Sequence, residues 1–405
     1  MQINIERLMR TFNQVGNIGG GENGVTRLPN SPAYKEAAVV LAGLMEEAGM
    51  TAHIDSVGNV IGCLPGKDAS LKHIAMGSHL DTVADAGLYD GNLGIHAALE
   101  CVNAMRDAGY RPNRSIEVIG FNFEEGSELG GTFGSRAMMG CGDALLPEVK
   151  RYFDKFGLDE RKVSDAKIDA GRLFAFFELH PEQGSRLEKQ GLPIGVVDSI
   201  IGIERYVVTV NGEYNAAGTT PMSMRKDSLF AAARLICEIE RLSGELTDPF
   251  VATVGRIEAF PGLLNVIPGK TELYLEIRDI RAENMRGFMD RLNDFIAAEK
   301  DFKITVEQII DKPPLALDAG LVSMLEDLCR ERGISSVTLP SFAGHDAKVM
   351  AAYVPAVMIF VPSAGGISHN KLEYTDPADI KTGTELLLEA VLKLDAAPES
   401  GACAL

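Results

Sequence analysis

The hydrophobic pattern near the start of the chain predicts one well-bounded helix. Apolar residues recur at helical spacing between Ala37 and Met45, which places them on one helix face. Ser31 can cap the first turn and Pro32 suits its first position, whereas Gly49 can end the helix. We therefore expect the first long packed element between Ser31 and Gly49.

After this helix, apolar runs of strand length alternate with helical spacing. The pattern predicts strands at 52–63, 73–78 and 115–123, and a helix at 93–108. Strands that alternate with helices favour an α/β layer built on a largely parallel sheet. Near the C-terminus the same pattern returns, with helices at 321–330 and 345–352 and a strand at 356–361.

The pattern changes after Gly202. It predicts, in order, a strand, a helix, two strands, a helix and a strand, at 206–210, 227–242, 250–257, 271–278, 282–298 and 302–309. The order βαββαβ is that of the split-βαβ sandwich, and its length suits one domain. We therefore expect a domain at 205–311 inserted into a discontinuous domain formed by 1–204 and 312–405.

Composition narrows the class of protein. The chain has 405 residues, of which 46% are hydrophobic, so it can bury a large core. Its formal net charge of −18 argues against nucleic-acid binding, which needs clustered Lys and Arg. The absence of a leader pattern or a long apolar run predicts a cytoplasmic protein with no membrane span. The six scattered cysteines predict reduced, buried thiols, so His and carboxylates would have to hold any metal.

Two motifs at the end of the strand at 73–78 carry candidate metal ligands. In GSHLDT (77–82), His79 lies at the strand end, and the Asp81 carboxylate could orient its imidazole by a hydrogen bond. In GLYDGNLG (87–94), Asp90 lies in a glycine-rich turn before a helix and could bridge two cations. The alternative is a helix-capping Asp and a His in a polar loop.

Two further strands end in similar residues. FNFEEG (121–126) places Glu124 and Glu125 side by side, which is costly unless a cation or a proton relieves the repulsion. If one carboxylate binds a metal, the other can take a proton from water; the alternative is a solvated acidic loop. FFELHPEQG (176–184) delivers His180, with Gln183 just behind it, although a lone His is more often structural.

The last candidate histidines lie near the C-terminus. His369 precedes a helix expected to begin near Asp376, and His345 lies at the start of another helix. His53, His73 and His96 have no such context and are interpreted as structural. Together, strand ends and loops of one sheet deliver ligands typical of Zn²⁺ or Mn²⁺, with Co²⁺ or Ni²⁺ as further candidates: His79, Asp90, Glu125, His180 and His369.

These motifs resemble the N-carbamoyl-L-amino acid hydrolase, β-ureidopropionase and allantoate amidohydrolase branch of the two-zinc aminoacylase and carboxypeptidase G superfamily. The resemblance runs from about Arg7 to Leu392. Besides the motifs above, it rests on segments in the family's order: AGTTPM (217–222), RKDSL (225–229), NVIPG (265–269), LEIRD (275–279), AGHDA (343–347) and SHNKLE (368–373).

The resemblance implies a role for each candidate residue. His79 and His180 would bind one metal, and Glu125 and His369 the other, with Asp90 bridging. Glu124 would be the general base and acid, and Asp81 the partner of His79. The substrate would be bound by Gln183, Asn265, Arg278 and His345, with Arg278 holding its carboxylate. The inserted domain would act as a lid and form a homodimer.

Two positions depart from the family. NAAGTTPM has Ala216 where a histidine usually reaches the partner subunit's active site, and EEGSEL has Glu128 and Leu129 where many members have Arg and Phe. A deliberate replacement made to trap a ligand and a natural variant with different chemistry would both explain Ala216.

The predicted activity is metal-dependent hydrolysis of the C–N bond of an N-carbamoyl-L-amino acid or a related ureido acid, such as allantoate or β-ureidopropionate. An N-acyl-amino acid or amino acid-conjugate amide hydrolase of the same superfamily is the nearest alternative, which a substrate panel would separate. An inactive binding protein on this fold is more remote, and metal analysis would test it.

Overall fold

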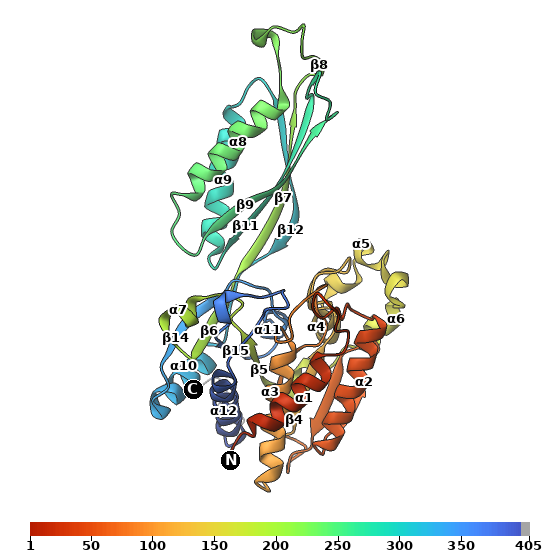
Figure 1. Ribbon diagram of the computed structural model, residues 1–405, viewed down its shortest axis with the longest axis vertical. Helices are drawn as coiled ribbons and strands as arrows, with labels where there is room; N and C mark the ends of the chain where they lie inside the picture. Colours follow the sequence, from red (N-terminus) through yellow and green to blue (C-terminus); the bar gives the residue numbers. More distant parts are fainter. Residues whose placement is uncertain (398–405) are drawn as a thin grey trace. The chain divides into compact units, whose positions relative to one another are not determined.

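The computed structural model describes residues 1–397 as two compact units (Figure 1). Unit 1 comprises Met1–Asp198 and Ala316–Leu405, and unit 2 comprises Ser199–Leu315. The division therefore falls slightly outside the boundaries expected from sequence, 204/205 and 311/312. None of the helices within residues 1–397 combines the length and the apolarity that crossing a membrane requires.

Unit 1 is built on one mixed sheet. Its order is β1-β2-β4-β3-β5-β15-β6-β13, with β14 paired to β6. The strands are β1 (Thr51–Ile54), β2 (Val60–Leu64), β3 (His73–His79), β4 (Ile116–Phe121), β5 (Leu173–Pro181), β6 (Ile194–Ile200), β13 (Leu315–Ala316), β14 (Ser336–Ser341) and β15 (Ala356–Val361). The central run β4-β3-β5-β15 is parallel, and β2 and β6 flank it antiparallel. The expected α/β layer with a parallel centre is therefore present.

The helices of unit 1 bury this sheet. They are α1 (Ile5–Gly16), α2 (Pro32–Glu47), α3 (Asn92–Asp107), α4 (Phe133–Met139), α5 (Pro147–Lys150), α6 (Glu160–Asp165), α7 (Arg186–Gln190), α10 (Ala319–Arg332), α11 (Asp346–Ala351) and α12 (Pro377–Asp395). Helix α3 packs on β3 and between α1 and α12, so nearly all its residues are buried. Ser31 caps α2 by accepting the Tyr34 N–H, which confirms the predicted cap.

The strand expected at 52–63 is a hairpin of β1 and β2 instead. The Asp55 carboxylate accepts the backbone N–H groups of Val57 and Asn59, which turns the chain. Gly58 completes this turn with φ +98°, a conformation that side chains disfavour. The apolar run alone did not reveal the turn, because Val57 is itself buried within it.

Unit 2 is a four-stranded antiparallel sheet in the order β12-β7-β11-β9. Its elements are β7 (Gly202–Asn211), α8 (Ser228–Ser243), β9 (Val251–Phe260), β11 (Lys270–Asp279), α9 (Ala282–Ala298) and β12 (Lys303–Lys312). Helices α8 and α9 cover one face, which matches the predicted βαββαβ order (Figure 1). A small ladder of β8 (Asn215–Ala216) and β10 (Val266–Ile267) extends beyond this sheet.

Five of the cysteines are free thiols, and Cys403 lies outside the described residues. Cys101 and Cys329 are buried, as expected. Cys63 and Cys141 are only partly buried, and Cys237 is exposed on α8. The prediction of buried thiols was therefore wrong for three positions, because scattered spacing says nothing about which face a cysteine occupies.

Candidate metal centre

The candidate site lies where the parallel strands of unit 1 end. His79 is the last residue of β3, and His180 is the second-to-last residue of β5. Glu124 and Glu125 follow β4, and His369 follows β15. The carboxyl ends of parallel strands share one edge, which is where open α/β sheets bind ligands. The structure thus brings these predicted side chains to the same edge.

Three imidazoles converge on the carboxylate of Asp90. Oδ1 lies 3.1 Å from Nε2 of His79 and 3.2 Å from Nε2 of His180. Oδ2 lies 3.1 Å from Nε2 of His369. The five predicted ligands form two overlapping groups that share Asp90, namely His79, Asp90 and His180, and Asp90, Glu125 and His369. Within each group the potential ligand atoms lie within 4.8 Å of one another.

Backbone carbonyls set the tautomers of the two buried histidines. Nδ1 of His79 is 2.9 Å from the carbonyl oxygen of Asp81, and Nδ1 of His180 is 2.9 Å from that of Pro181. A carbonyl oxygen can only accept, so each Nδ1 carries a proton and each Nε2 faces Asp90. Lone pairs that face a carboxylate need a proton or a cation between them. The donor set of imidazoles and carboxylates therefore fits two borderline divalent cations.

The charges of this cluster are strongly perturbed. Burial would raise the pKa of Asp90, but hydrogen bonds from His180, His369 and His79 outweigh it and hold this pKa well below its usual range. The hydrogen bond to Asp90 raises the pKa of His369 to about 9. Burial, together with the nearby Asp90, raises the pKa of Glu125 to about 7.

Glu124 lies beside the two ligand groups. One of its carboxylate oxygens is 3.9 Å from Nε2 of His79. Burial, with additional repulsion from Glu125, raises the pKa of Glu124 well above its usual range although His79 opposes the shift. A carboxyl whose pKa is raised by burial is suited to accept a proton and to return it.

The sequence predicted that the Asp81 carboxylate orients the His79 imidazole by a hydrogen bond, and this prediction was wrong about the atoms involved. The Asp81 carboxylate accepts the backbone N–H groups of Glu124 and Glu125, each at 3.1 Å, instead of bonding to the His79 ring. It is the Asp81 carbonyl that orients His79. The chain leaves the strand after His79, so strand alternation no longer predicts where the Asp81 side chain points. Asp81 still supports the site, because it fixes the loop that carries both glutamates.

Glu373 was missed as a site residue although it ends the SHNKLE motif. Its Oε2 accepts the backbone N–H groups of Tyr89 and Asp90 at 2.8 and 3.0 Å. Its Oε1 accepts the Ser368 hydroxyl at 2.9 Å. Glu373 therefore holds the turn that presents Asp90. The sequence signal that could have identified Glu373 is its position four residues after His369 in the SHNKLE motif.

Backbone conformation shapes the same loops. A Cβ on Gly91 would lie 2.4 Å from the carbonyl oxygen of His79 and 2.5 Å from its ring, so the Asp90 turn can approach His79 only with glycine. Phe123, Gln183 and His369 adopt positive φ values of 61°, 58° and 53°. Such left-handed conformations of non-glycine residues are uncommon and cluster at functional sites.

Two predicted substrate-binding residues of unit 1 also lie here. The Gln183 amide nitrogen donates to Asp90 Oδ2 at 2.7 Å, and Gln183 Oε1 is buried without a hydrogen-bond partner within residues 1–397. His345 directly precedes α11. Its ring centroid lies 4.6 Å from that of His180, and its Nε2 lies 2.7 Å from the Ser341 hydroxyl. Burial, reinforced by repulsion from His180, lowers the pKa of His345 well below its usual range, which keeps the ring neutral.

The three predicted residues of unit 2 do not lie together. Arg278 is near the end of β11 and pairs in register with Ile203, close to where the chain enters this unit. Asn265 and Ala216 lie beyond the other end, where the Asn265 carbonyl accepts the Ala217 N–H. The eight residue-to-residue steps from Lys270 to Arg278 span roughly 26 Å at about 3.3 Å per step. Arg278 and Asn265 of one chain therefore cannot contact one small substrate together.

A second cluster of potential ligands lies at the amino ends of the same strands. Nδ1 of His73 is 2.6 Å from Glu117, and Arg172 pairs with the other oxygen of Glu117 at 2.8 Å. Cys63 is the third potential ligand of this group. Arg172 already neutralises Glu117, so an ion-paired network explains these contacts, in agreement with the structural interpretation of His73.

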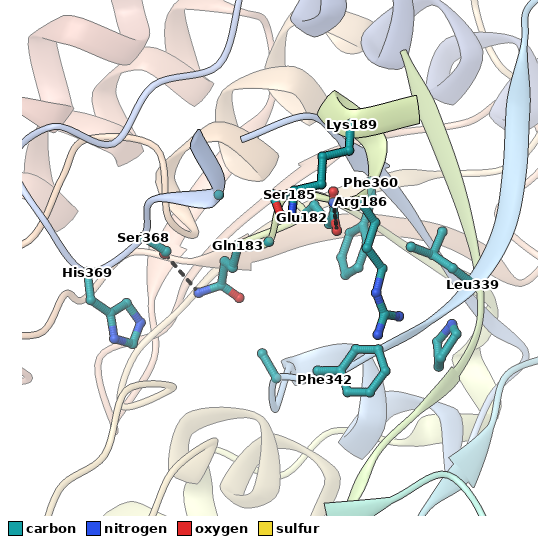
Figure 2. Close-up of a pocket in the computed structure, with 14 residues that line it drawn as sticks. Glu182, Gln183, Ser185, Arg186, Lys189, Leu339, Phe342, Phe360, Ser368 and His369 are labelled. Carbon is teal, nitrogen blue, oxygen red and sulfur yellow. Dashed lines mark hydrogen bonds between the residues drawn. The ribbon is translucent and has the colours of Figure 1, made fainter. Parts of the chain in front are cut away.

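A cavity of about 610 Å³ opens beside the metal centre within unit 1 (Figure 2). Gln183, Ser368 and His369 line one side of it. Arg186 and Phe342 line the opposite side. A volume of this size suits a small-molecule ligand.

Comparisons with known proteins agree with this geometry. Residues 75–393 match peptidase family M20/M25/M40. The chain is 37% identical to an N-carbamoyl-L-amino-acid amidohydrolase of Pseudomonas sp. (strain NS671), covering 96% of this chain and 98% of that protein. It is 36% identical to an allantoate amidohydrolase of Escherichia coli K12, covering 90% and 91%. A crystal structure of an amidase of the hydantoinase/carbamoylase family from Burkholderia multivorans superposes with a TM-score of 0.86 at 30% identity, covering 98% and 99%.

Proposed function

The chain belongs to peptidase family M20/M25/M40, and we propose that it hydrolyses the C–N bond of an N-carbamoyl-L-amino acid or a related ureido acid. The match to amidohydrolases over nearly the full chain confirms the predicted family and the predicted enzyme class, a hydrolase of linear amide C–N bonds. The observation that carries the proposal is the convergence of His79, His180 and His369 on the Asp90 carboxylate. The exact substrate within this class stays a prediction.

We propose that His79, Asp90 and His180 hold one divalent cation and that Asp90, Glu125 and His369 hold the other. The overlap of the two residue groups at Asp90 supports a bridging role for this carboxylate. When bound, such cations polarise a scissile carbonyl and make water acidic enough to react near neutral pH. Zinc and manganese both accept this donor set, so the native metal stays open between them, with cobalt and nickel as further candidates.

We assign the proton transfers to Glu124. Its carboxyl is buried beside His79 and carries a raised pKa, so it can take a proton from attacking water. It can then deliver that proton to the departing nitrogen, which is a poor leaving group until it is protonated. The Asp81 carboxylate, which holds the Glu124 backbone N–H, positions this loop. With a carbamoyl substrate the products are the amino acid, ammonia and carbon dioxide.

We assign the substrate's α-carboxylate to Arg278. Its guanidinium is about one-third exposed and bonds to Glu276 through Nε at 2.7 Å. A guanidinium can hold a carboxylate by two parallel hydrogen bonds, which fixes both position and rotation. His345, kept neutral by burial, lies beside His180 and can contact the scissile group as a hydrogen-bond donor or acceptor.

The end of unit 2 that carries Ala216 and Asn265, called its tip below, supports a homodimer. Ala216 and Asn265 lie far from Arg278 on the same chain, so they can assist a substrate held by Arg278 only from another subunit. Large apolar side chains surround this tip and are strongly exposed: Met222 (65%), Met224 (71%), Leu263 (58%) and Leu264 (105%). Exposed apolar patches of this kind mark interaction sites. We infer that this tip reaches the partner's active site and that unit 2 forms the dimer interface.

We further propose that unit 2 closes over the substrate by bending near its two connections to unit 1. Gly202 lies where a Cβ would be 2.6 Å from Pro314, so the entering and leaving segments touch at a position that needs glycine. Closure would exclude water from the site.

Light scattering should give a dimer at working concentration, and a monomer would contradict the proposed dimer interface. A cytoplasmic location also stays a prediction.

A substrate panel tests the proposed activity. The chain would be stripped of metal, reloaded with Zn²⁺ or Mn²⁺, and supplied with N-carbamoyl, N-acyl and ureidoglycolate-type substrates. Ammonia release from ureido substrates is the expected result, with little turnover of N-acyl substrates. Turnover of N-acyl substrates alone would favour the amide hydrolase alternative. No turnover and no bound metal would favour an inactive binding protein.

A further inference from the structure

The guanidinium of Arg186 lies in the cavity beside the candidate metal centre. Its Cζ is 3.9 Å from the centroid of the Phe342 ring, and Figure 2 shows both side chains facing the open space. In the part of the chain that the structure describes, no carboxylate forms a salt bridge with this guanidinium. The chain carries a net charge of −18, so acidic partners are abundant elsewhere.

The acidic residues nearest in sequence are already engaged. Both oxygens of Glu182 accept backbone N–H groups, from Arg186 at 2.9 Å and from Leu187 at 2.8 Å. Both oxygens of Glu188 lie about 3 Å from the backbone nitrogen of Gly365. These carboxylates stabilise the backbone around α7 and do not neutralise Arg186.

An arginine held against an aromatic ring is a pre-organised anion receptor. The ring fixes the guanidinium by a cation–π contact and removes water from one of its faces. The N–H groups at its edge remain able to donate two parallel hydrogen bonds to a carboxylate. Lys189, also on the cavity wall, adds a second positive charge. A dicarboxylate would therefore find a complementary charge at this end of the cavity.

The opposite wall of the cavity carries the candidate metal-binding residue His369 and the adjacent Gln183 (Figure 2). Leu339 and Phe360 supply apolar surface on the cavity wall. We propose that this cavity selects ureido acids whose side chain carries a second carboxylate, and that Arg186 binds that carboxylate. The inference rests on the proposed function, because it places the scissile ureido group at the metal-centre end.

Binding of two matched ligands tests this selectivity. N-carbamoyl-L-glutamate and N-carbamoyl-L-glutamine have nearly the same shape and differ in the side-chain charge. Calorimetry would use the metal-loaded full chain with Glu124→Gln to suppress turnover, and kcat/KM would be measured with Glu124 intact. Because charged hydrogen bonds are strong, we expect the glutamate compound to be favoured by about 10-fold to 100-fold in both measurements.

Two variants test whether the preference for the glutamate compound depends on the charge of Arg186 or only on an intact cavity. Arg186→Met keeps an extended apolar side chain and should bring the glutamate-to-glutamine ratio close to one. Arg161→Met removes an exposed arginine from α6 and should leave that ratio as in the parent. An unchanged ratio in Arg186→Met would overturn the assignment.

The remaining outcomes distinguish this inference from the proposed function. Binding that favours the glutamate compound without hydrolysis of any ureido acid would leave Arg186 as an anion site and refute the proposed activity. Hydrolysis of ureido acids without preference for the glutamate compound would refute the inference alone. Tighter binding of the glutamine compound or of N-carbamoyl-L-phenylalanine would show that the pocket prefers uncharged side chains and would refute the inference, as would failure of both matched ligands to bind.

Discussion

The Glu373 carboxylate accepts the backbone N–H of Asp90, with Oε2 3.0 Å from that nitrogen. The same side chain accepts the Ser368 hydroxyl at 2.9 Å through Oε1. Glu373 thus connects the C-terminal loop that carries His369 to the turn that carries Asp90. The two residue groups proposed to hold the two cations share this mechanical support.

Replacing Glu373 with glutamine should weaken metal binding. The amide nitrogen cannot accept a hydrogen bond, so the Ser368 contact must reverse its direction, and the Tyr89 and Asp90 N–H groups lose the charged acceptor that holds them. Loss of such a supporting contact typically costs about 10-fold to 100-fold in metal affinity. Titration of the metal-free variant with Zn²⁺ measures the effect, and excess metal should restore much of the activity. Parent-like affinity would show that Glu373 only stabilises the fold.

Replacing Glu124 with glutamine should remove turnover and keep the metals. An amide of the same shape can neither accept the proton of water nor deliver it to the leaving nitrogen, which corresponds to a loss of about 10²-fold to 10⁴-fold. Metal analysis and kcat are the measurements. Glu128→Gln makes the same change in an exposed side chain that pairs with Lys155, and serves as the control. Turnover within a few-fold of the parent would exclude Glu124 as the proton shuttle.

Strand-end placement is the part of the site that sequence could predict. The apolar runs before His79 and Glu124 locate the ends of β3 and β4, and parallel strands bring such ends to one edge. Helix periodicity similarly located α9 at Ala282–Ala298. These features depend on local pattern together with one general rule of sheet architecture.

Contacts between distant loops could not be predicted in the same way. The Glu373 contact to Asp90 joins residues separated by 283 positions, and no local pattern encodes it. The direction of the Asp81 side chain depends on the Glu124 and Glu125 N–H groups, which only the folded loop brings near. The short helices after β4 are defined by packing among aromatic rings such as Phe133 and Phe153 and lack a long apolar repeat.

Replacing Arg278 with lysine should mainly raise KM for carboxylate substrates. An ammonium group is a point charge and cannot reproduce two parallel hydrogen bonds. Steady-state kinetics across several ureido acids measures the change. Arg256→Lys, in an exposed arginine of the neighbouring strand β9, is the matched control. If KM stays constant for every carboxylate substrate, the anion is bound elsewhere.

His96 should make the protein less stable at mildly acidic pH. Its Nδ1 lies 3.1 Å from the Thr11 hydroxyl, which itself donates to the Leu8 carbonyl, so Nδ1 carries the proton. Nε2 is buried and has no hydrogen-bond partner within residues 1–397. Burial, together with Arg27, lowers the pKa of His96 to about 3. The folded protein therefore excludes a proton that the unfolded chain binds below about pH 6.5.

The sign of the effect follows from this difference in proton binding. Between about pH 6.5 and pH 3 the unfolded state binds more protons at His96, so the free energy of unfolding falls with falling pH, by about 1.4 kcal/mol per unit at most. Denaturant unfolding of the parent and of His96→Gln between pH 7.5 and 5.5 measures this slope. The variant should show a shallower dependence, whereas His53→Gln, at an exposed position of β1, should keep the parent's slope. Equal slopes in all three proteins would contradict the assignment.

Restoring a histidine at Ala216 should increase turnover. Ala216 is exposed on β8, where it pairs with Val266 of β10 beside Asn265, so an imidazole can be added without displacing a core residue. In the proposed dimer this tip reaches the partner's site, where an imidazole would stabilise the negative charge that develops on the carbonyl oxygen. One donor of this kind is typically worth about 10²-fold to 10³-fold in kcat.

The alanine lacks that donor, while the residues proposed to bind the metals all lie in unit 1 and are unaffected. Ala216→His should therefore raise kcat on the true substrate by at least about tenfold without changing the metal content. Ala217→His, the same change one residue along the chain in the turn that follows β8, is the control. Activity equal to or below that of the parent would mean that the chain performs its reaction without an imidazole from this tip.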